Sequence, residues 1–257
     1  MKLGFVGSGA ITAAIVTGLN SAFGEKHSIR LSPRNAKIAS DLATRFPGVS
    51  VAASNQDVLD SSDVVVLAVR PQVAVSVVSQ LRFRPDHHVI SLISAFSLAR
   101  ISELVAPATK VGRAVPLPSV ANRRGPTAIY PLDRLVAELF DRLGTAIEVE
   151  SENEFDAFCA ATATIASYFA FADAISSWLA GRGVPGPKAR DYVTRIFVGL
   201  ANANVEAPER SLQSLADEHS TRGGINEQLL THLVEHHVFE NLSQGLDEVL
   251  RRIVSAS

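Results

Sequence analysis

From Leu3 to Thr12 the chain reads LGFVGSGAIT, and a helix-like run, Ala13–Leu19, follows directly. An apolar run that leads into Gly-x-Gly and then into a helix is the context of a dinucleotide-binding loop. Gly7 permits a tight turn, and Gly9 has no side chain, so a pyrophosphate can approach the backbone. The helix that follows would point free N–H groups and a positive dipole end at the phosphates. The third glycine of the full pattern is Thr12 here, and a tight turn without a ligand is the alternative interpretation.

The first 150 residues alternate short β-branched runs with helix-sized spacers. The run Val64–Val69 is apolar throughout, as expected of a strand that is covered on both faces of a parallel sheet. Ala36–Phe46 places its apolar residues at helical spacing. The alternation predicts an α/β fold with a doubly wound, Rossmann-like parallel sheet. Strands are expected at Leu3–Val6, Ile29–Ser32, Val49–Ala52, Val64–Val69, Val89–Ile93, Lys110–Ala114, Thr127–Tyr130 and Ala146–Val149, with a helix near Leu132–Leu143.

Beyond residue 150 the strand signals end, so we expect a Rossmann domain over residues 1–150 and an all-α domain over residues 151–257. Ser151 and Glu154 form a capping box that opens a long apolar helix, in which Asp173 is the only charge between Ala157 and Ala180. That helix is long enough to cross a bilayer, but its acid and its many small residues favour burial inside protein. Further helices are expected from Gly186 and over Ser211–Glu218, Ile225–His236 and Phe239–Val254.

Composition excludes several functional classes. The 257 residues carry 24 basic and 26 acidic side chains, a formal net charge of −2, whereas a nucleic-acid-binding protein usually has a basic surplus. A single cysteine, Cys159, excludes an intramolecular disulfide and a cysteine-based zinc site, and we expect it to be buried. His232 and His236 have the spacing of a zinc helix without the accompanying Glu, so no metal is expected. The chain starts without a signal-peptide pattern, so we expect a cytoplasmic protein.

The end of the second predicted strand bears on the choice of dinucleotide. An NAD-dependent enzyme would place an acid there to bind the ribose 2′-hydroxyl, but the sequence has no acid between Glu25 and Asp41. Ser32 and Arg34 suit a 2′-phosphate, because they offer a hydroxyl and a planar cation. The sequence therefore predicts NADP, with NADPH favoured over NADH. A solvated surface arginine is the alternative interpretation of Arg34.

The sequence resembles the pyrroline-5-carboxylate reductases, which make proline by hydride transfer to a cyclic imine. The resemblance covers nearly the whole chain and rests on Gly7–Gly9, Asn55–Asp57, Ala68–Gln72 (where the family usually has Ala-Val-Lys-Pro), Val89–Ser91, Arg113–Pro116, Glu148–Glu150 and Phe155–Ala157. It implies that the helical domain interlocks with a second subunit in a homodimer or a larger homo-oligomer. It implies cofactor contacts from Asn55, Ala68, Val69, Arg70 and Pro71. With the glycine loop and the end of the second strand, the full set of candidate cofactor residues also includes Gly7, Ser8, Gly9, Ala10, Ile11, Ser32, Arg34 and Ser94.

The departures from the family pattern cluster where the family binds its substrate. The family's Met-Pro-Asn-Thr-Pro is Val115–Ser119 here, and its Ser-Gly-Ser-Gly-Pro-Ala-Tyr is Thr162–Tyr168. Its Ser-Pro-Gly-Gly-Thr-Thr is Thr221–Asn226, with Ile225 in place of the first Thr. Phe96 is bulky where the family keeps small residues under the nicotinamide. The pocket is therefore expected to differ from the family's in shape and charge.

Reduction of an imine requires a donor near the imine nitrogen and a site that holds the substrate. The matching positions make Thr162, Thr164 and Asn226 the candidate catalytic residues. Gly223, Gly224 and Ile225 are the candidate substrate-binding residues, because backbone N–H groups before a helix bind carboxylates. In the alternative interpretation, the threonine hydroxyls bond their own helix and the two glycines only separate two helices.

Three hypotheses follow. The first is NADPH-dependent reduction of a small cyclic imino acid, with pyrroline-5-carboxylate, which would yield proline, as the first substrate to test. The second is a reductase with a pocket reshaped by Ile225 and Phe96 for another imine or a keto substrate. The third is a dinucleotide-binding dimer without catalytic activity. None of the three involves a nucleic-acid or membrane partner.

Overall fold

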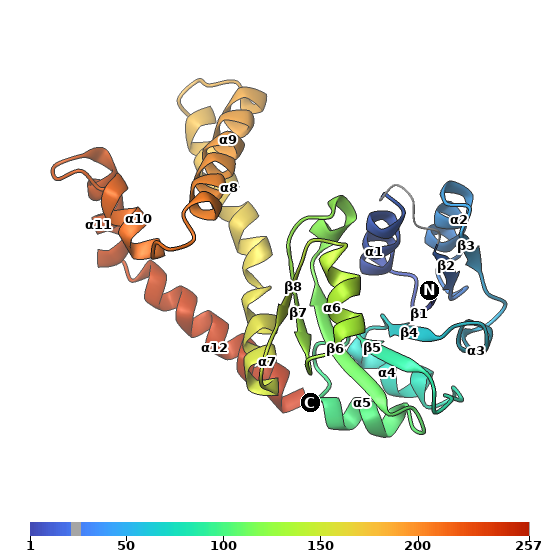
Figure 1. Cartoon of the computed structure of the whole chain (residues 1–257). Helices are drawn as coiled ribbons and strands as arrows, with labels where there is room; N and C mark the ends of the chain where they lie inside the picture. Colours follow the sequence, from blue (N-terminus) through green and yellow to red (C-terminus); the bar gives the residue numbers. More distant parts are fainter. Residues whose placement is uncertain (22–26, 257) are drawn as a thin grey trace. The chain divides into compact units, whose positions relative to one another are not determined.

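The protein forms two compact units (Figure 1). The structure is a computed structural model that describes residues 1–21 and 27–256. The first unit comprises Met1–Thr162 together with Val249–Ser257, and the second comprises Ala163–Glu248. The first contains all the strands of the described chain, and the second is helical.

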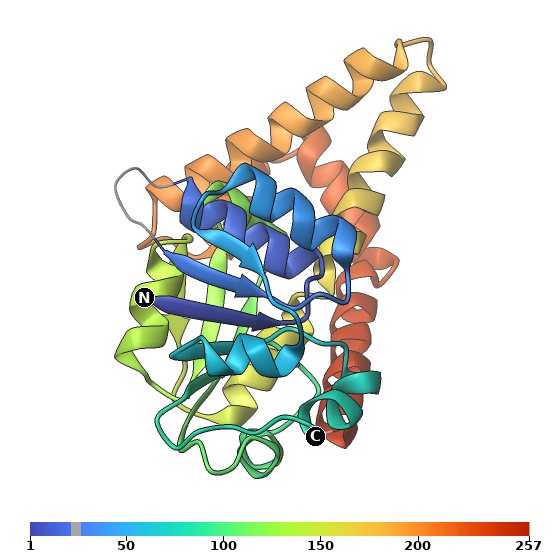
Figure 2. The same ribbon diagram turned by 90° about the vertical axis from the view of Figure 1, so that its right-hand side faces the viewer.

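The first unit is built on one eight-stranded sheet of order β3-β2-β1-β4-β5-β6-β7-β8. Neighbouring strands run parallel except for β6 and β7, which are joined by a link too short for a parallel crossover. The predicted doubly wound sheet is confirmed, and Figure 2 shows helices on both of its faces. The strands are β1 Lys2–Val6, β2 Ser28–Leu31, β3 Val49–Val51, β4 Val64–Leu67, β5 His88–Ser91, β6 Lys110–Pro116, β7 Pro126–Tyr130 and β8 Thr145–Glu148.

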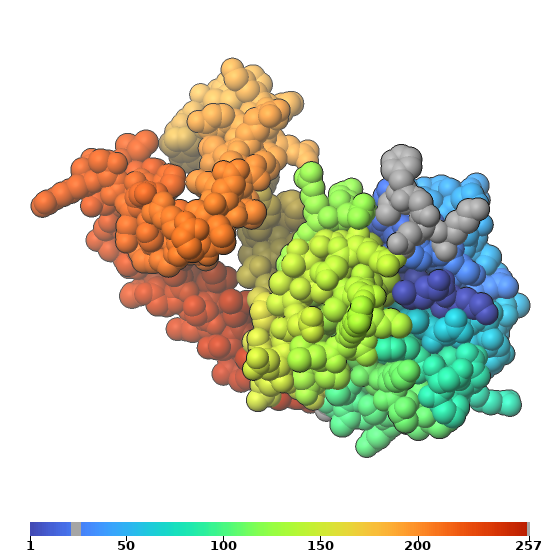
Figure 3. All heavy atoms as spheres, in the orientation of Figure 1, coloured from blue at the N-terminus to red at the C-terminus, as the bar shows by residue number. Residues whose placement is uncertain are grey.

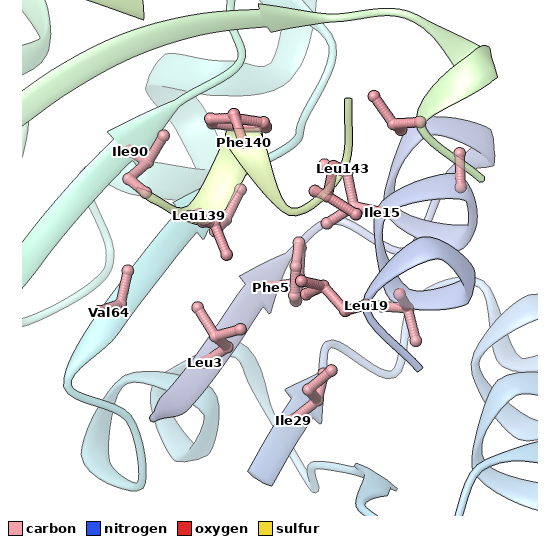
Figure 4. Packing of buried hydrophobic residues seen from close by; sticks show 14 of the residues in the cluster. Leu3, Phe5, Ile15, Leu19, Ile29, Val64, Ile90, Leu139, Phe140 and Leu143 are labelled. Atoms are coloured by element: carbon pink, nitrogen blue, oxygen red, sulfur yellow. The ribbon is translucent and has the colours of Figure 1, made fainter. Parts of the chain in front are cut away.

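Apolar side chains from alternate strand positions build a core on each face of the sheet. Leu3 and Phe5 of β1 enter one cluster with Ile15 and Leu19 (Figure 4), whereas Val6 enters the opposite cluster. This two-sided burial explains why the strands are apolar without interruption. The helices between them are α1 Ala10–Asn20, α2 Ala36–Arg45, α3 Asn55–Asp60, α4 Pro71–Val78, α5 Leu98–Leu104, the short 3-10 helix η1 Pro118–Asn122, and α6 Arg134–Asp141.

A third apolar cluster attaches helix α7, Glu152–Ala161, to the first unit. Phe155 and Cys159 of α7 pack with Ala128 of β7 and with Ile253, which lies near the end of α12, Val238–Ala256. The change to helical structure occurs near residue 150, where it was predicted. The first compact unit nevertheless extends to Thr162, because α7 buries its apolar face against the sheet.

The second unit contains the hairpin of α8, Thr164–Ala180, and α9, Gly186–Glu206, followed by α10, Leu212–His219, and α11, Ile225–Glu235. The rings of Tyr168 and Phe197 join α8 to α9, with their centroids 5.6 Å apart. The atoms of α9, coloured orange, lie at the surface of this unit in Figure 3. The predicted start of a helix at Gly186 is confirmed.

Two expectations about the apolar helix are wrong. It is not continuous, because the chain turns at Thr162 and Ala163 between α7 and α8. Within the single chain it is not buried on all sides either: no described residue of α8 is buried, and Phe169 and Trp178 are 65% and 55% exposed. By length and composition, Glu152–Ala180 is the one described segment that could cross a membrane. Intramolecular packing does not cover these apolar side chains.

The close approach of α1 to η1 gives a test of the fold. A Cβ at Gly18 would lie 2.2 Å from the Val120 carbonyl oxygen. We therefore expect Gly18→Ala to lower the free energy of unfolding by about 1–3 kcal/mol through overpacking, although alanine is the better helix former. Thermal or urea unfolding measures the change. The control is Ser40→Ala, an exposed site on α2, which should stay within about 0.5 kcal/mol of the wild type. Equal stability of all three proteins would contradict the packing described here.

Candidate functional site

A cavity of about 480 Å³ lies at the carboxyl ends of β1, β2 and β4. It is lined by the loop after β1 (Gly7–Gly9), by Arg34–Ala36 after β2, by Ala68–Arg70 after β4, and by Val73. Strand β1 lies between β2 and β4, so the order of the sheet reverses at this point. Doubly wound sheets bind their ligands outside the carboxyl ends of the strands at such a reversal.

The loop after β1 has a shape that only glycine allows at residue 7. Gly7 has φ +108°, and a Cβ there would lie 2.4 Å from the Ala68 carbonyl oxygen. The Thr12 hydroxyl donates a hydrogen bond to the Gly7 carbonyl oxygen at 2.6 Å, and Thr12 is fully buried. The threonine that replaces the third glycine of the pattern therefore closes the turn with a side-chain hydrogen bond.

Ser32, the first residue after β2, supports this loop. Its hydroxyl oxygen accepts a hydrogen bond from the Gly7 N–H at 2.9 Å. The Ser8 hydroxyl in turn donates to the Ser32 carbonyl oxygen at 2.7 Å, and both serines are buried. The Ser32 hydroxyl is thus buried and bonded within the protein, and its contact with a 2′-phosphate stays a prediction.

The cavity has the properties of an anion site. A Cβ at Gly9 would meet no described atom within 4 Å, so the backbone there is open to a ligand. Helix α1 begins at the next residue, and no side chain of the described protein caps it, which leaves N–H groups of the first turn for a ligand. Gly7, Ser8 and Gly9 thus lie where the sequence predicted the pyrophosphate. These residues fit the phosphates of a dinucleotide.

Two cations border the same cavity. Arg34 and Arg70 are exposed and line it, and no acidic residue of the described chain does so. Over residues 1–21 and 27–256, neither arginine forms an ion pair with a carboxylate. Their charges are therefore available to phosphate groups. Asn35, Ala36 and Val73 also line the cavity; sequence reasoning missed them, although their places just after β2 and in the first turn of α4 were the available signal.

The other predicted cofactor residues follow the carboxyl ends of strands but do not line this cavity. Ala10 and Ile11 form the first turn of α1, and Pro71 is the first residue of α4. Asn55 begins α3, after β3. Ser94 lies in the loop after β5, and its carbonyl oxygen accepts a hydrogen bond from Arg113. Contacts of these residues with a cofactor stay predictions.

Two candidate catalytic side chains have partners within the protein. The Thr162 hydroxyl donates to the Cys159 carbonyl oxygen at 2.7 Å, which is the alternative role foreseen for a helical threonine. The Asn226 side-chain amide donates to the His219 carbonyl oxygen at 2.9 Å. Thr164 is the half-buried first residue of α8. Thr162 belongs to the first compact unit, whereas Thr164 and Asn226 belong to the second.

The predicted substrate turn is already occupied by a carboxylate of the protein. The Gly223 N–H donates to the Glu227 Oε2 at 2.6 Å, and Gly224 is the N-cap of α11. Ile225 is 84% exposed. The arrangement places a negative charge at the group expected to bind the substrate carboxylate. Sequence reasoning missed Glu227, although its position in the first turn of a helix is typical of a capping residue.

Two further side chains are accounted for by packing. Phe96 is buried in the apolar cluster opposite Leu3, and the Arg100 guanidinium lies 4.0 Å from the centre of its ring. Phe96 is therefore part of the core, and its predicted effect on the shape of the substrate pocket stays a prediction. Burial raises the pKa of the Cys159 thiol to about 12. Since the thiolate is the nucleophilic form, this buried cysteine is not a candidate nucleophile.

Comparisons with known proteins match both parts of the chain. Residues 2–95 match the family model "NADP oxidoreductase coenzyme F420-dependent", and residues 152–255 match "Pyrroline-5-carboxylate reductase dimerisation". The pyrroline-5-carboxylate reductase of Vibrio alginolyticus is 25% identical, over 98% of this chain and 96% of that protein. The solved reductase of Streptococcus pyogenes superimposes with a TM-score of 0.87 at 26% identity, over 99% of this chain and 98% of that one. The chain belongs to the pyrroline-5-carboxylate reductase family.

The family assignment also explains the helical part of the chain. Helices α7 to α12 of this chain coincide with residues 152–255, which match the family model for the dimerisation domain. The exposed apolar side chains of α8 lie within the residues that match this dimerisation model. A structure from Plasmodium falciparum, described as a pyrroline carboxylate reductase with NADP bound, has the same fold, with a TM-score of 0.85 at 19% identity over 100% of this chain and 98% of that one.

The two loop glycines should respond differently to substitution. Gly9→Ala adds a methyl group to open space, so we expect an unchanged melting temperature and NADPH binding weakened by about tenfold or more, equivalent to about 1.4 kcal/mol. Gly7→Ala should lower the melting temperature as well, because it forces a strained φ and a clash with Ala68. Differential scanning fluorimetry and NADPH fluorescence titration measure both effects. Normal NADPH binding by Gly9→Ala would place the nucleotide elsewhere.

Proposed function

We propose that the protein reduces the C=N bond of a small cyclic imine with NADPH, and that pyrroline-5-carboxylate, which would yield proline, is the first substrate to test. The observation that carries the proposal is the cavity at the ends of β1, β2 and β4, with its bare Gly9 backbone and its two arginines. Membership of the pyrroline-5-carboxylate reductase family makes the protein an oxidoreductase of the C=N class.

The protein's own groups would hold the dinucleotide. Backbone N–H groups at Gly9 and the start of α1 would receive the pyrophosphate. Bound NADPH supplies a hydride to the imine carbon, and the imine nitrogen takes a proton, so that an amine and NADP⁺ result. The protein contributes orientation and electrostatics to this chemistry.

The preference for NADPH over NADH rests on the end of β2. Arg34 lies there at the cavity, and the loop carries no acid of the kind that binds a ribose 2′-hydroxyl in NAD enzymes. A guanidinium suits a phosphate because it offers two parallel N–H donors. The Plasmodium falciparum relative, with NADP in its described complex, is consistent with this choice.

The same proposal includes a homodimer or larger homo-oligomer in the cytoplasm. The apolar side chains of α8 that intramolecular packing leaves exposed would be covered by a second copy. Contact with a second copy would bury this apolar helix, as the sequence predicted, and no membrane would be needed to do so.

A second candidate substrate class is an imine without a carboxylate. Glu227 favours it, because its carboxylate already accepts the Gly223 N–H and would repel a substrate carboxylate at that turn. Ile225 favours it too, because it adds apolar surface and no hydroxyl at the neighbouring position.

Loss of NADPH absorbance with a panel of three imines tests both candidates. The panel consists of pyrroline-5-carboxylate, its six-membered-ring homologue and 1-pyrroline, which lacks the carboxylate. Turnover of pyrroline-5-carboxylate in preference to 1-pyrroline is expected from the first candidate, and the reverse order from the second. NADPH binding without turnover of any of the three would leave a dinucleotide-binding protein without this activity.

Two arginine variants test which phosphate group of the dinucleotide each arginine binds. Arg34→Ala should reduce the ratio of NADPH to NADH affinity on the order of tenfold, because it removes a charge-assisted hydrogen bond to the 2′-phosphate alone. Arg70→Ala, at the other side of the loop, is the matched control and should weaken both nucleotides alike if it contacts the pyrophosphate. Fluorescence titrations give the four dissociation constants. An unchanged ratio in Arg34→Ala would remove the basis for the NADP preference.

A further inference from the structure

A buried arginine outside the cavity forms a charged cluster with two acids of α7. Arg113 of β6 is 1% exposed. Its Nη1 donates to the Glu152 Oε1 at 2.7 Å, and its Nη2 donates to the Asp156 Oδ1 at 2.9 Å. The Phe155 ring lies under the guanidinium, with 4.3 Å from Cζ to the ring centre. Glu152, Phe155 and Asp156, on one face of α7, thus all contact the Arg113 side chain.

The same cluster holds the loop that follows β5. Nη2 of Arg113 also donates to the Ser94 carbonyl oxygen at 3.0 Å. At the other end of the loop, the Leu98 N–H, the first of α5, donates to the Glu152 Oε1. Glu152 therefore joins the arginine and the loop through one oxygen atom. The loop of residues 94–98 is therefore bonded at Ser94 to β6 and at Leu98 to α7.

Fold stability is a poor explanation of this cluster. Taking a guanidinium out of water is costly, and a buried ion pair is often no more stabilising than apolar residues of the same volume. One cation faces two carboxylates here, and the Arg113 Nε has no hydrogen-bond partner in the described structure. The arrangement instead defines a geometry, because each charged group has a fixed set of partners.

The loop held in this way lies on the nicotinamide side of the proposed cofactor site. Strand β5 pairs with β4, with Leu67 opposite Ser91, so residues 94–98 follow the strand next to the Ala68–Arg70 loop of the cavity. In doubly wound sheets a dinucleotide lies across the reversal point, with one nucleotide over each half of the sheet. In the proposed cofactor site, Arg34 binds the 2′-phosphate at the end of β2. The other half then extends past β4 toward β5.

We propose that Arg113, Glu152 and Asp156 are positioning residues, which hold the loop of residues 94–98 in the place that the nicotinamide half of the cofactor requires. The inference rests on the proposed NADPH site but not on the identity of the imine. The three side chains act through the loop and do not themselves touch the cofactor. Loss of the cluster should therefore affect the nicotinamide half and spare the adenosine half.

Glu152→Ala is the main test, because this side chain is 31% exposed and its loss is the mildest for folding. The probes are NADPH and adenosine 2′,5′-bisphosphate, which lacks the nicotinamide half. We expect NADPH to bind about tenfold more weakly, as for the loss of one charge-assisted hydrogen bond, and the bisphosphate affinity to stay within about twofold. Glu152→Gln, which keeps an acceptor oxygen, should recover part of the loss. Hydrogen exchange of residues 94–98 should rise in Glu152→Ala.

Glu154→Ala is the matched control. Glu154 also lies in the first turn of α7 and accepts a backbone N–H, that of Glu150, but it does not touch the loop. Both probes should bind this variant as they bind the wild type. Equal weakening of both probes in Glu152→Ala would show that the cluster acts on the whole domain, and unchanged binding of both would show that the loop needs no such support; either result overturns the proposal.

The binding test is separable from the test of function. A wild-type protein that binds NADPH but reduces no imine refutes the proposed reaction and leaves the loop experiment valid. A wild-type protein that binds neither probe overturns the positioning role together with the cofactor site.

Discussion

Three segments of the chain meet at Gly7. Its N–H is bonded to the Ser32 hydroxyl after β2, its carbonyl oxygen accepts the Thr12 hydroxyl of α1, and the space of a side chain is taken by the Ala68 carbonyl after β4. A residue with a Cβ would separate the loops after β1 and β4, because both are continuous with buried strands. The open backbone at Gly9 and the start of α1 depend on this contact. The anion site is therefore a consequence of close backbone packing at the reversal point of the sheet.

Three arginines of the first unit, Arg34, Arg70 and Arg113, fall into two groups with different roles. Arg34 and Arg70 are exposed at the cavity, where water solvates them until a phosphate binds. Arg113 is withdrawn from water, and its two Nη groups pair with Glu152 and Asp156. A buried charge of this kind costs desolvation energy whether or not a ligand is present. The first group suits recognition of an anion, whereas the second suits a fixed arrangement of the backbone.

The helical unit exposes many apolar side chains in the single chain. Its α8 has helix-forming residues and large apolar side chains, such as Phe169 and Trp178, but none of its described residues is buried. An apolar surface of this size is costly in water. This helix lies within the match to a dimerisation model, and in the proposed homo-oligomer a second copy would bury it. The same composition satisfies a length and hydropathy test for a membrane helix.

Local patterns in the sequence predicted the strands, the glycine loop and the position of Arg34, because apolar periodicity and glycine placement are properties of neighbouring residues. The role of Arg70 was implied only by the family resemblance. Those patterns did not predict that Ser32 would support the loop, that Phe96 would enter the core, or that Arg113 would meet two acids of α7. These outcomes depend on which strands and helices the fold brings together. The sequence determines the polarity of a side chain. Its hydrogen-bond partner depends on residues that are distant in sequence and that the tertiary structure brings close in space.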